Sequence, residues 1–239
     1  MEPRSATLSL SEMPVLLRGE AAPIHRWIDQ WSNSRALCLV LMTIIGTALF
    51  GAAVGSWRDA LQAGYTALKF PLLILLTTLG TALLNGMLAP LLGLNIRFSQ
   101  SLLAVLLSFT IFAMIVGSFS PLMFFLIWNT PPMQSAQTAT AYRSVLLVQV
   151  AIIAFAGIAA NVRLLQLLEH LSGKRSVAFK ILFAWLAANL FLGSQLCWIM
   201  RPFIGSPGLP VQFLRPDAFR GNFYEAVFYS ITTLLSQKN

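Results

Sequence analysis

The chain has 239 residues, of which 57% are hydrophobic and only 10% are charged, and its mean hydropathy is +0.74. These values exclude an ordinary soluble domain and are typical of integral membrane proteins, because lipid solvates apolar side chains on every face of a helix. Lysine and arginine outnumber aspartate and glutamate by 16 to 8, but they are scattered over loops and tails. We therefore expect these cations to lie at lipid headgroups, and we expect no nucleic-acid partner.

Residues 1–35 form a polar amino-terminal region. Acidic residues and two prolines near its start are unlike a cleaved signal peptide. Farther on, Ile24, Trp27, Ile28 and Trp31 recur at spacings of three and four, which predicts a short helix in the membrane interface. Trp27 and Trp31 are candidate partner contacts, with simple anchoring at headgroup depth as the alternative.

Five apolar segments between residues 36 and 200 predict an all-α transmembrane bundle. Each approaches or exceeds the roughly 20 residues needed to cross a hydrocarbon core of about 30 Å. Pro121, which follows a run of Gly and Ser, is expected to kink the third segment. A simple packing kink and a discontinuous-helix site are both open as explanations of this break. The expected spans are 36–55, 70–92, 101–128, 144–163 and 181–200.

Positive charges indicate the orientation of the bundle. Arg163, Lys174, Arg175 and Lys180 cluster around the loop between the fourth and fifth spans. Because cytoplasmic loops are enriched in Lys and Arg, this loop and the amino terminus are predicted to be cytoplasmic. The host membrane is expected to be a bacterial inner membrane or a eukaryotic endomembrane.

The spans offer polar groups but no recognisable chemistry. All acidic residues lie outside the expected spans, and the two histidines belong to different surface segments. We therefore expect no catalytic, cofactor or metal site, and no enzymatic activity. Cys38 and Cys197 lie in apolar runs and are expected to be packing residues. Five amides remain within the spans and are expected either to bond between helices or to line a conduction path: Asn85, Gln149, Asn161, Asn189 and Gln195.

The carboxyl-terminal region, 201–239, departs from the membrane-span pattern. Arg201 and Pro202 end the fifth apolar segment, and further prolines keep the following chain extended. Asn222 and Glu225 fit a helix cap, so residues 222–236 are expected to form an amphipathic helix. This region is interpreted as a lid, a contact for another subunit, or a tail folded on its own bundle. Its candidate contact residues are Arg201, Phe213, Arg215, Phe219 and Phe223.

Five hydrophobic segments after a polar amino-terminal region resemble the Yip1-type membrane proteins, and residues 57–128 are similar in texture to their early spans. The resemblance implies a non-catalytic role in membrane trafficking or organisation. The sequence thus predicts a structural or assembly subunit of a membrane complex, with other membrane-protein subunits or a second copy as partners. A channel or transporter subunit for a neutral or anionic solute is the alternative, and an enzyme acting on lipid is a third.

Overall fold

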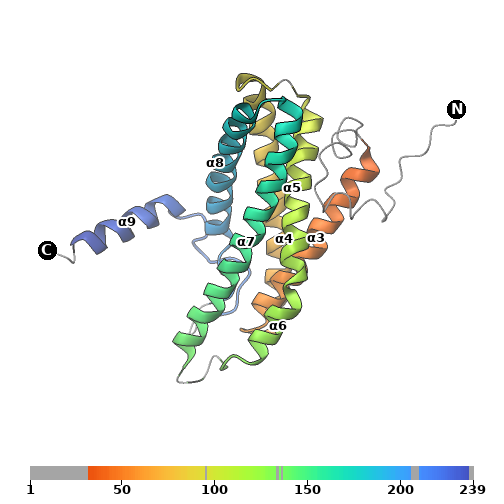
Figure 1. Ribbon diagram of the computed structural model, residues 1–239. Helices are drawn as coiled ribbons and strands as arrows, with labels where there is room; N and C mark the ends of the chain where they lie inside the picture. Colours follow the sequence, from red (N-terminus) through yellow and green to blue (C-terminus); the bar gives the residue numbers. More distant parts are fainter. Residues whose placement is uncertain (1–31, 95, 133–134, 136, 206–209, 237–239) are drawn as a thin grey trace.

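The computed structural model describes residues 32–94, 96–132, 135, 137–205 and 210–236, and the expected helix with Trp27 and Trp31 lies outside them. The regular structure of the described residues is entirely helical (Figure 1). Five helical stretches are long and apolar enough to cross a membrane, so the predicted all-α, five-span class is confirmed. The helices are α3 (Asn33–Gly55), α4 (Ala60–Leu91), α5 (Phe98–Ser118), α6 (Ser120–Trp128), α7 (Thr138–Ser172), α8 (Arg175–Met200) and α9 (Phe223–Ser236).

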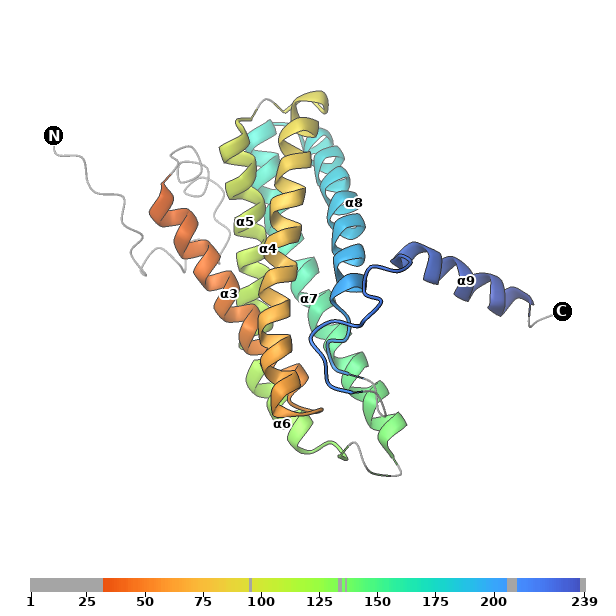
Figure 2. The ribbon, with the colours of Figure 1, turned by 180° about the vertical axis from the view of Figure 1, so that it is seen from behind.

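Four helices enclose the centre of the bundle. Helix α4 packs against α5 and α8, and α7 packs against the same two helices from the other side. Helix α3 lies outside this ring, against α4 and α5 (Figures 1 and 2). We call the end where α4 joins α5 and α7 joins α8 the turn end, and the opposite end, where α3 joins α4, the tail end.

Glycines allow α3 to approach α5 closely. A Cβ atom at Gly46 would collide with the carbonyl oxygen of Ala113, and one at Gly117 would lie 2.8 Å from the Cα of Gly46. Small residues of this kind let helix backbones pack tightly in lipid. The hydroxyls of Thr43 and Thr110 lie 3.1 Å apart across the same contact, which adds a buried polar link.

The third and fourth spans differ in continuity. Helix α5 ends at Ser118 and α6 begins at Ser120, with Pro121 in the first turn of α6, so the predicted interruption is confirmed. The two helices together form one span of 31 residues. Helix α7 continues without a break to Ser172, beyond the expected boundary at residue 163, and Gly173 adopts a positive φ of 62° and ends it.

Helix α4 begins earlier than expected. Asp59 caps it by accepting a hydrogen bond of 2.7 Å from the Leu61 amide, so the helix starts ten residues before the expected boundary at residue 70. Its 32 residues give a length of about 48 Å, which exceeds a hydrocarbon core of about 30 Å. The helix thus includes Lys69, which lies just before the expected start of the second span.

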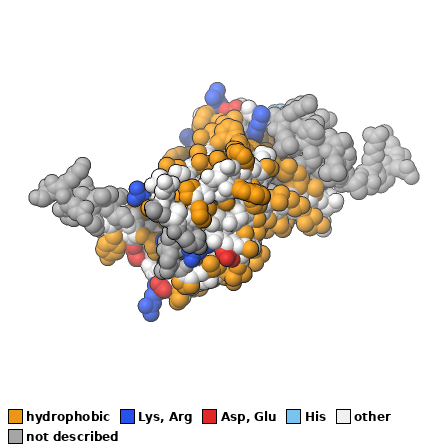
Figure 3. Space-filling model, turned by 90° about the horizontal axis from the view of Figure 1, so that it is seen from below, with side chains coloured by type: hydrophobic (Ala, Val, Ile, Leu, Met, Phe, Trp, Pro, Cys, Tyr) orange, Lys and Arg blue, Asp and Glu red, His pale blue; other side chains and the backbone are white. Residues whose placement is uncertain are grey.

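The outer surface of the bundle is mainly apolar, as a surface that contacts lipid must be. Seen from the tail end, broad hydrophobic areas separate the few charged side chains (Figure 3). Large apolar side chains are also exposed along the helices, for example Ile45, Met87, Leu147 and Phe183. These residues contact lipid in a membrane, because no other helix of the described chain covers them.

Candidate functional site

The most unusual polar group in the bundle is Lys69, which is completely buried on α4. Its Nζ donates a hydrogen bond of 2.6 Å to the carbonyl oxygen of Pro202, 133 residues later in the chain. The same Nζ lies 5.1 Å from the ring centroid of Phe213 and 5.9 Å from that of Phe203. Burial removes hydration from the ammonium group, and this carbonyl and the two aromatic rings offset part of that cost.

Two further side chains of α4 bind the same segment. The Gln62 amide donates to the carbonyl oxygens of Phe203, at 2.7 Å, and of Pro202, at 3.2 Å. The Thr66 hydroxyl is 2.6 Å from the Phe203 carbonyl oxygen. Lys69, Thr66 and Gln62 thus satisfy main-chain acceptors of the segment that leaves α8. We call residues 201–205 and 210–221 the tail segment, and Figure 2 shows it against the lower part of the bundle.

Sequence reasoning missed this docking site because the second span was expected to begin at residue 70. The signal was nevertheless present. Gln62, Thr66 and Lys69 are spaced by four and then three residues, so they form one polar stripe in the first part of the helix. Such a stripe within a membrane helix indicates that something polar lies against it, here the tail segment.

Aromatic contacts extend the docking beyond the polar stripe. The rings of Tyr65 and Phe213 meet edge to face, with centroids 5.4 Å apart, and Phe203 meets Phe70 in the same way at 5.3 Å. Phe213, a predicted contact residue, therefore packs on its own bundle. Phe219, another predicted contact, is exposed.

Two arginines gather on one indole where α8 ends. The guanidinium carbon of Arg201 lies 3.3 Å from the ring centroid of Trp198, and that of Arg215 lies 5.4 Å from it. Both guanidinium groups also point a nitrogen at the Trp198 carbonyl oxygen, at 3.2 and 3.5 Å. Burial, and then repulsion by Arg215, lower the pKa of Arg201 below its ordinary value. The structure thus places the predicted residues Arg201 and Arg215 side by side.

Helix α9 is attached through its first turn. Asn222 accepts a hydrogen bond of 2.9 Å from the Glu225 amide, and the Glu225 carboxylate accepts one of 3.3 Å from the Asn222 amide, which confirms the predicted cap. The Tyr224 ring stacks on Phe191 of α8, and its hydroxyl lies 2.7 Å from that of Ser194. The amide of Phe223, a predicted contact residue, donates to Gln195 at 3.2 Å. Beyond this turn the helix projects away from the bundle (Figures 1 and 2).

A cavity of about 240 Å³ lies inside the ring of α4, α5, α7 and α8. Its wall is mainly apolar, and its polar residues include Asn161 and Asn189, which the sequence had singled out. Asn189 accepts a hydrogen bond of 2.7 Å from Thr81, and the Asn161 amide donates to the Gly157 carbonyl oxygen at 2.7 Å. Cavities of this kind, apolar with a few fixed polar groups, are typical of small-molecule sites.

The remaining predicted amides lie elsewhere. Gln195 holds the start of α9, as described above. Asn85 is completely buried, and neither its side-chain oxygen nor its nitrogen has a hydrogen-bond partner among the described residues. The side-chain oxygen of the buried Gln149 likewise has none within this part of the chain. Neither residue lines the cavity.

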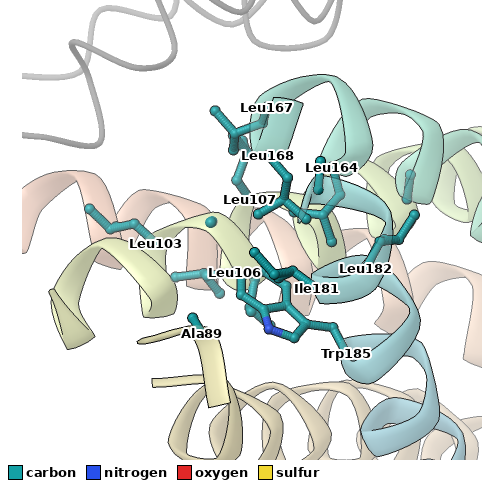
Figure 4. Close-up of a cluster of buried hydrophobic side chains, with 14 of the residues drawn as sticks. Ala89, Leu103, Leu106, Leu107, Leu164, Leu167, Leu168, Ile181, Leu182 and Trp185 are labelled. Carbon is teal, nitrogen blue, oxygen red and sulfur yellow. The ribbon is translucent and has the colours of Figure 1, made fainter. Parts of the chain in front are cut away.

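A large apolar cluster borders the cavity toward the turn end. Trp185, Ile181 and Leu182 of α8 face leucines of α5 and α7 there (Figure 4). Ala160 belongs both to this cluster and to the cavity wall. Toward the tail end, Pro202 and Phe203 pack on Lys69 and Phe70, one turn before the cavity residue Leu73. The cavity therefore lies between the apolar cluster and the docked tail segment.

Comparison with known proteins gives no assignment: no protein-family model matches the chain, and no curated protein or solved structure matches it either.

Proposed function

We propose that this chain is a non-enzymatic integral membrane protein that serves as an assembly subunit of a membrane complex, with α9 as its contact for a neighbouring protein. The observation that carries the proposal is the exposure of α9 beyond its anchored first turn. Phe228 and Tyr229 are 64% and 69% exposed, and Val227 is exposed beside them. Aromatic side chains are enriched in protein interfaces because they bury much area at little entropic cost.

The way in which α9 is held supports the same function. The tail segment is fixed on α4 by Lys69, Thr66 and Gln62, and the first turn of α9 is fixed on α8 by Tyr224. A helix that is oriented before binding loses less conformational freedom when a partner docks. A partner in the same membrane, either another protein or a second copy of this chain, suits this geometry. The role in membrane organisation implied by the Yip1-type resemblance is compatible with such an assembly function.

The test is photo-crosslinking in the native membrane, with a photoreactive amino acid in place of Phe228. The matched control places it at Leu147, an equally exposed apolar position on the lipid-facing side of α7. We expect position 228 to give a protein adduct of discrete mass and position 147 to give lipid adducts. Deletion of residues 223–239 should then reduce the native size of the complex in mild detergent. Lipid adducts at both positions, with no change in native size, would contradict the proposal.

A second candidate function, passage or binding of a neutral solute, is favoured by the cavity that Asn161 and Asn189 line. Its test is solute flux into liposomes that contain the purified chain, measured across a panel of neutral and anionic solutes. Substitution of Asn189→Leu should lower the flux, whereas Gln149→Leu should not, because Gln149 lies outside the cavity. Absence of flux for the whole panel, or an unchanged rate in Asn189→Leu, would exclude this candidate.

A further inference from the structure

The pair formed by Arg201 and Arg215 has no electrostatic explanation within the described chain. Their guanidinium groups share the Trp198 ring and the Trp198 carbonyl oxygen, and neither forms an ion pair with a described carboxylate. Nη2 of Arg201 and Nε of Arg215 are buried and make no hydrogen bond to the described residues. Arg175 differs, because it is paired with Glu169 at 3.2 Å.

Two like charges held side by side are costly unless an opposite charge joins them. Each cation in a partly buried setting repels its neighbour, and Arg215 accordingly lowers the pKa of Arg201. The acidic residues of the tail segment and α9 do not offset this. Glu225 is engaged in the cap of α9, and Asp217 makes no ion pair among the described residues.

The position of the pair indicates what the missing counter-charge is. Arg201 directly follows Met200, the last residue of a membrane span, and both arginines are only partly buried. A span end of this kind meets the headgroup layer, where phosphate is the abundant anion. Guanidinium groups suit phosphate because their planar donor sets match its oxygens, and the Trp198 ring holds one of them in place.

We propose that Arg201 and Arg215, held on Trp198, form a binding site for one phosphate group, supplied by an anionic lipid headgroup or by a free phosphate. Trp198 orients Arg201, the docked tail segment delivers Arg215, and the exposed parts of both guanidinium groups donate to the phosphate oxygens. The site is independent of the proposed assembly role, because it requires no protein partner.

The experiment uses the full-length chain, purified from liposomes of equal parts phosphatidylcholine and phosphatidylglycerol, with bound lipid counted by native mass spectrometry. We expect one phosphatidylglycerol molecule per chain to be retained in preference to phosphatidylcholine. Arg215→Gln should lower this preference about fivefold, because the headgroup phosphate loses one of the two unpaired guanidinium groups that bind it. Arg201→Gln should act in the same direction, and Arg175→Gln, at the turn end, should have no effect.

A competition measurement identifies the source of the phosphate, and a second variant covers the case in which Arg201→Gln fails to fold. Inorganic phosphate, added to the detergent-solubilised protein, should displace the retained lipid if phosphate alone is recognised, and should fail to do so if the lipid chains are also required. Either result identifies the source of the phosphate, provided that Arg215→Gln weakens the retention. If Arg201→Gln does not fold, Arg215→Gln carries the test, because Arg215 lies in the tail segment and does not itself end α8. An equal preference in wild type, Arg215→Gln and Arg175→Gln would overturn the proposal.

Discussion

The two ends of the bundle are held together by different forces. At the turn end, the Trp185 cluster is apolar and packs leucines from α5 and α7 against α8 (Figure 4). At the tail end, α4 holds the main chain of a distant segment through Lys69, Thr66 and Gln62. Apolar packing depends on shape and volume, whereas the polar contacts specify one segment in one position. The contacts that are specific to this chain therefore lie at the tail end, whereas the turn end is held mainly by apolar packing.

The largest effect is expected at the turn end, from Trp185→Ala. Trp185 is almost fully buried and its ring nitrogen has no described hydrogen-bond partner, so the loss is one of packing alone. Such a truncation costs about 3–5 kcal/mol of unfolding free energy in soluble cores. Unfolding in mixed detergent micelles measures it, and Phe183→Ala, on a side chain that is 76% exposed, is the matched control. Equal stability of the two variants would show that the cluster does not hold the turn end.

At the tail end, Lys69→Met should release the tail segment while leaving the bundle folded. The variant loses a hydrogen bond from a charged donor, which contributes about 1.5–3 kcal/mol, and its contacts with two aromatic rings. Trypsin cleavage after Arg220 reports the opened population, so we expect its rate to rise at least about tenfold. Lys180→Met, on an exposed side chain of α8, is the control. An unchanged cleavage rate in Lys69→Met would show that Lys69 does not hold the tail segment on α4.

A smaller effect is expected at α9, where Asn222→Ala removes the cap. The Glu225 amide then loses its acceptor, which costs about 1 kcal/mol of helix stability. Hydrogen exchange of the amides in residues 223–236 should become faster, while exchange in α8 stays the same. Asn129→Ala removes an amide bonded to the Phe125 carbonyl oxygen of α6 and serves as the control. Slow exchange in Asn222→Ala would mean that contacts with α8 alone fix this helix.

The smallest effect is expected between the two ends, where Thr81 donates to Asn189. Thr81→Val removes one interhelical hydrogen bond and should lower the unfolding free energy by about 0.6 kcal/mol. Thr78→Val is a close control, because the Thr78 hydroxyl donates to Ile74 within its own helix. The same unfolding assay applies to both. If Thr81→Val lowered the unfolding free energy as much as Lys69→Met does, the strongest polar contact would be the one between Thr81 and Asn189 in the middle of the bundle.

Features that depend on local sequence could be predicted, whereas contacts between distant segments could not. Hydropathy predicted the five spans, and Pro121 with the Gly and Ser residues before it predicted the break, because each depends on local chemistry. The docking of Pro202 on Lys69 joins residues 133 positions apart, and no local pattern encodes that pairing. Helices that are apolar on all sides also conceal their rotation, so the meeting of Asn161 and Asn189 at one cavity could not be predicted.

The central claim is that Lys69 fixes the tail segment on α4, and one cross-linking measurement tests it most directly. Tyr65→Cys and Phe213→Cys are combined in a chain whose own cysteines are replaced by Cys38→Ser and Cys197→Ser, and a short bifunctional thiol reagent is added in the membrane. The two native rings lie 5.4 Å apart, so we predict rapid cross-linking, strongly reduced when Lys69→Met is added. Pairing Tyr65→Cys with a cysteine at the exposed position of Phe219 should give little product. Equal yields for both cysteine pairs, or a yield that Lys69→Met leaves unchanged, would contradict the account.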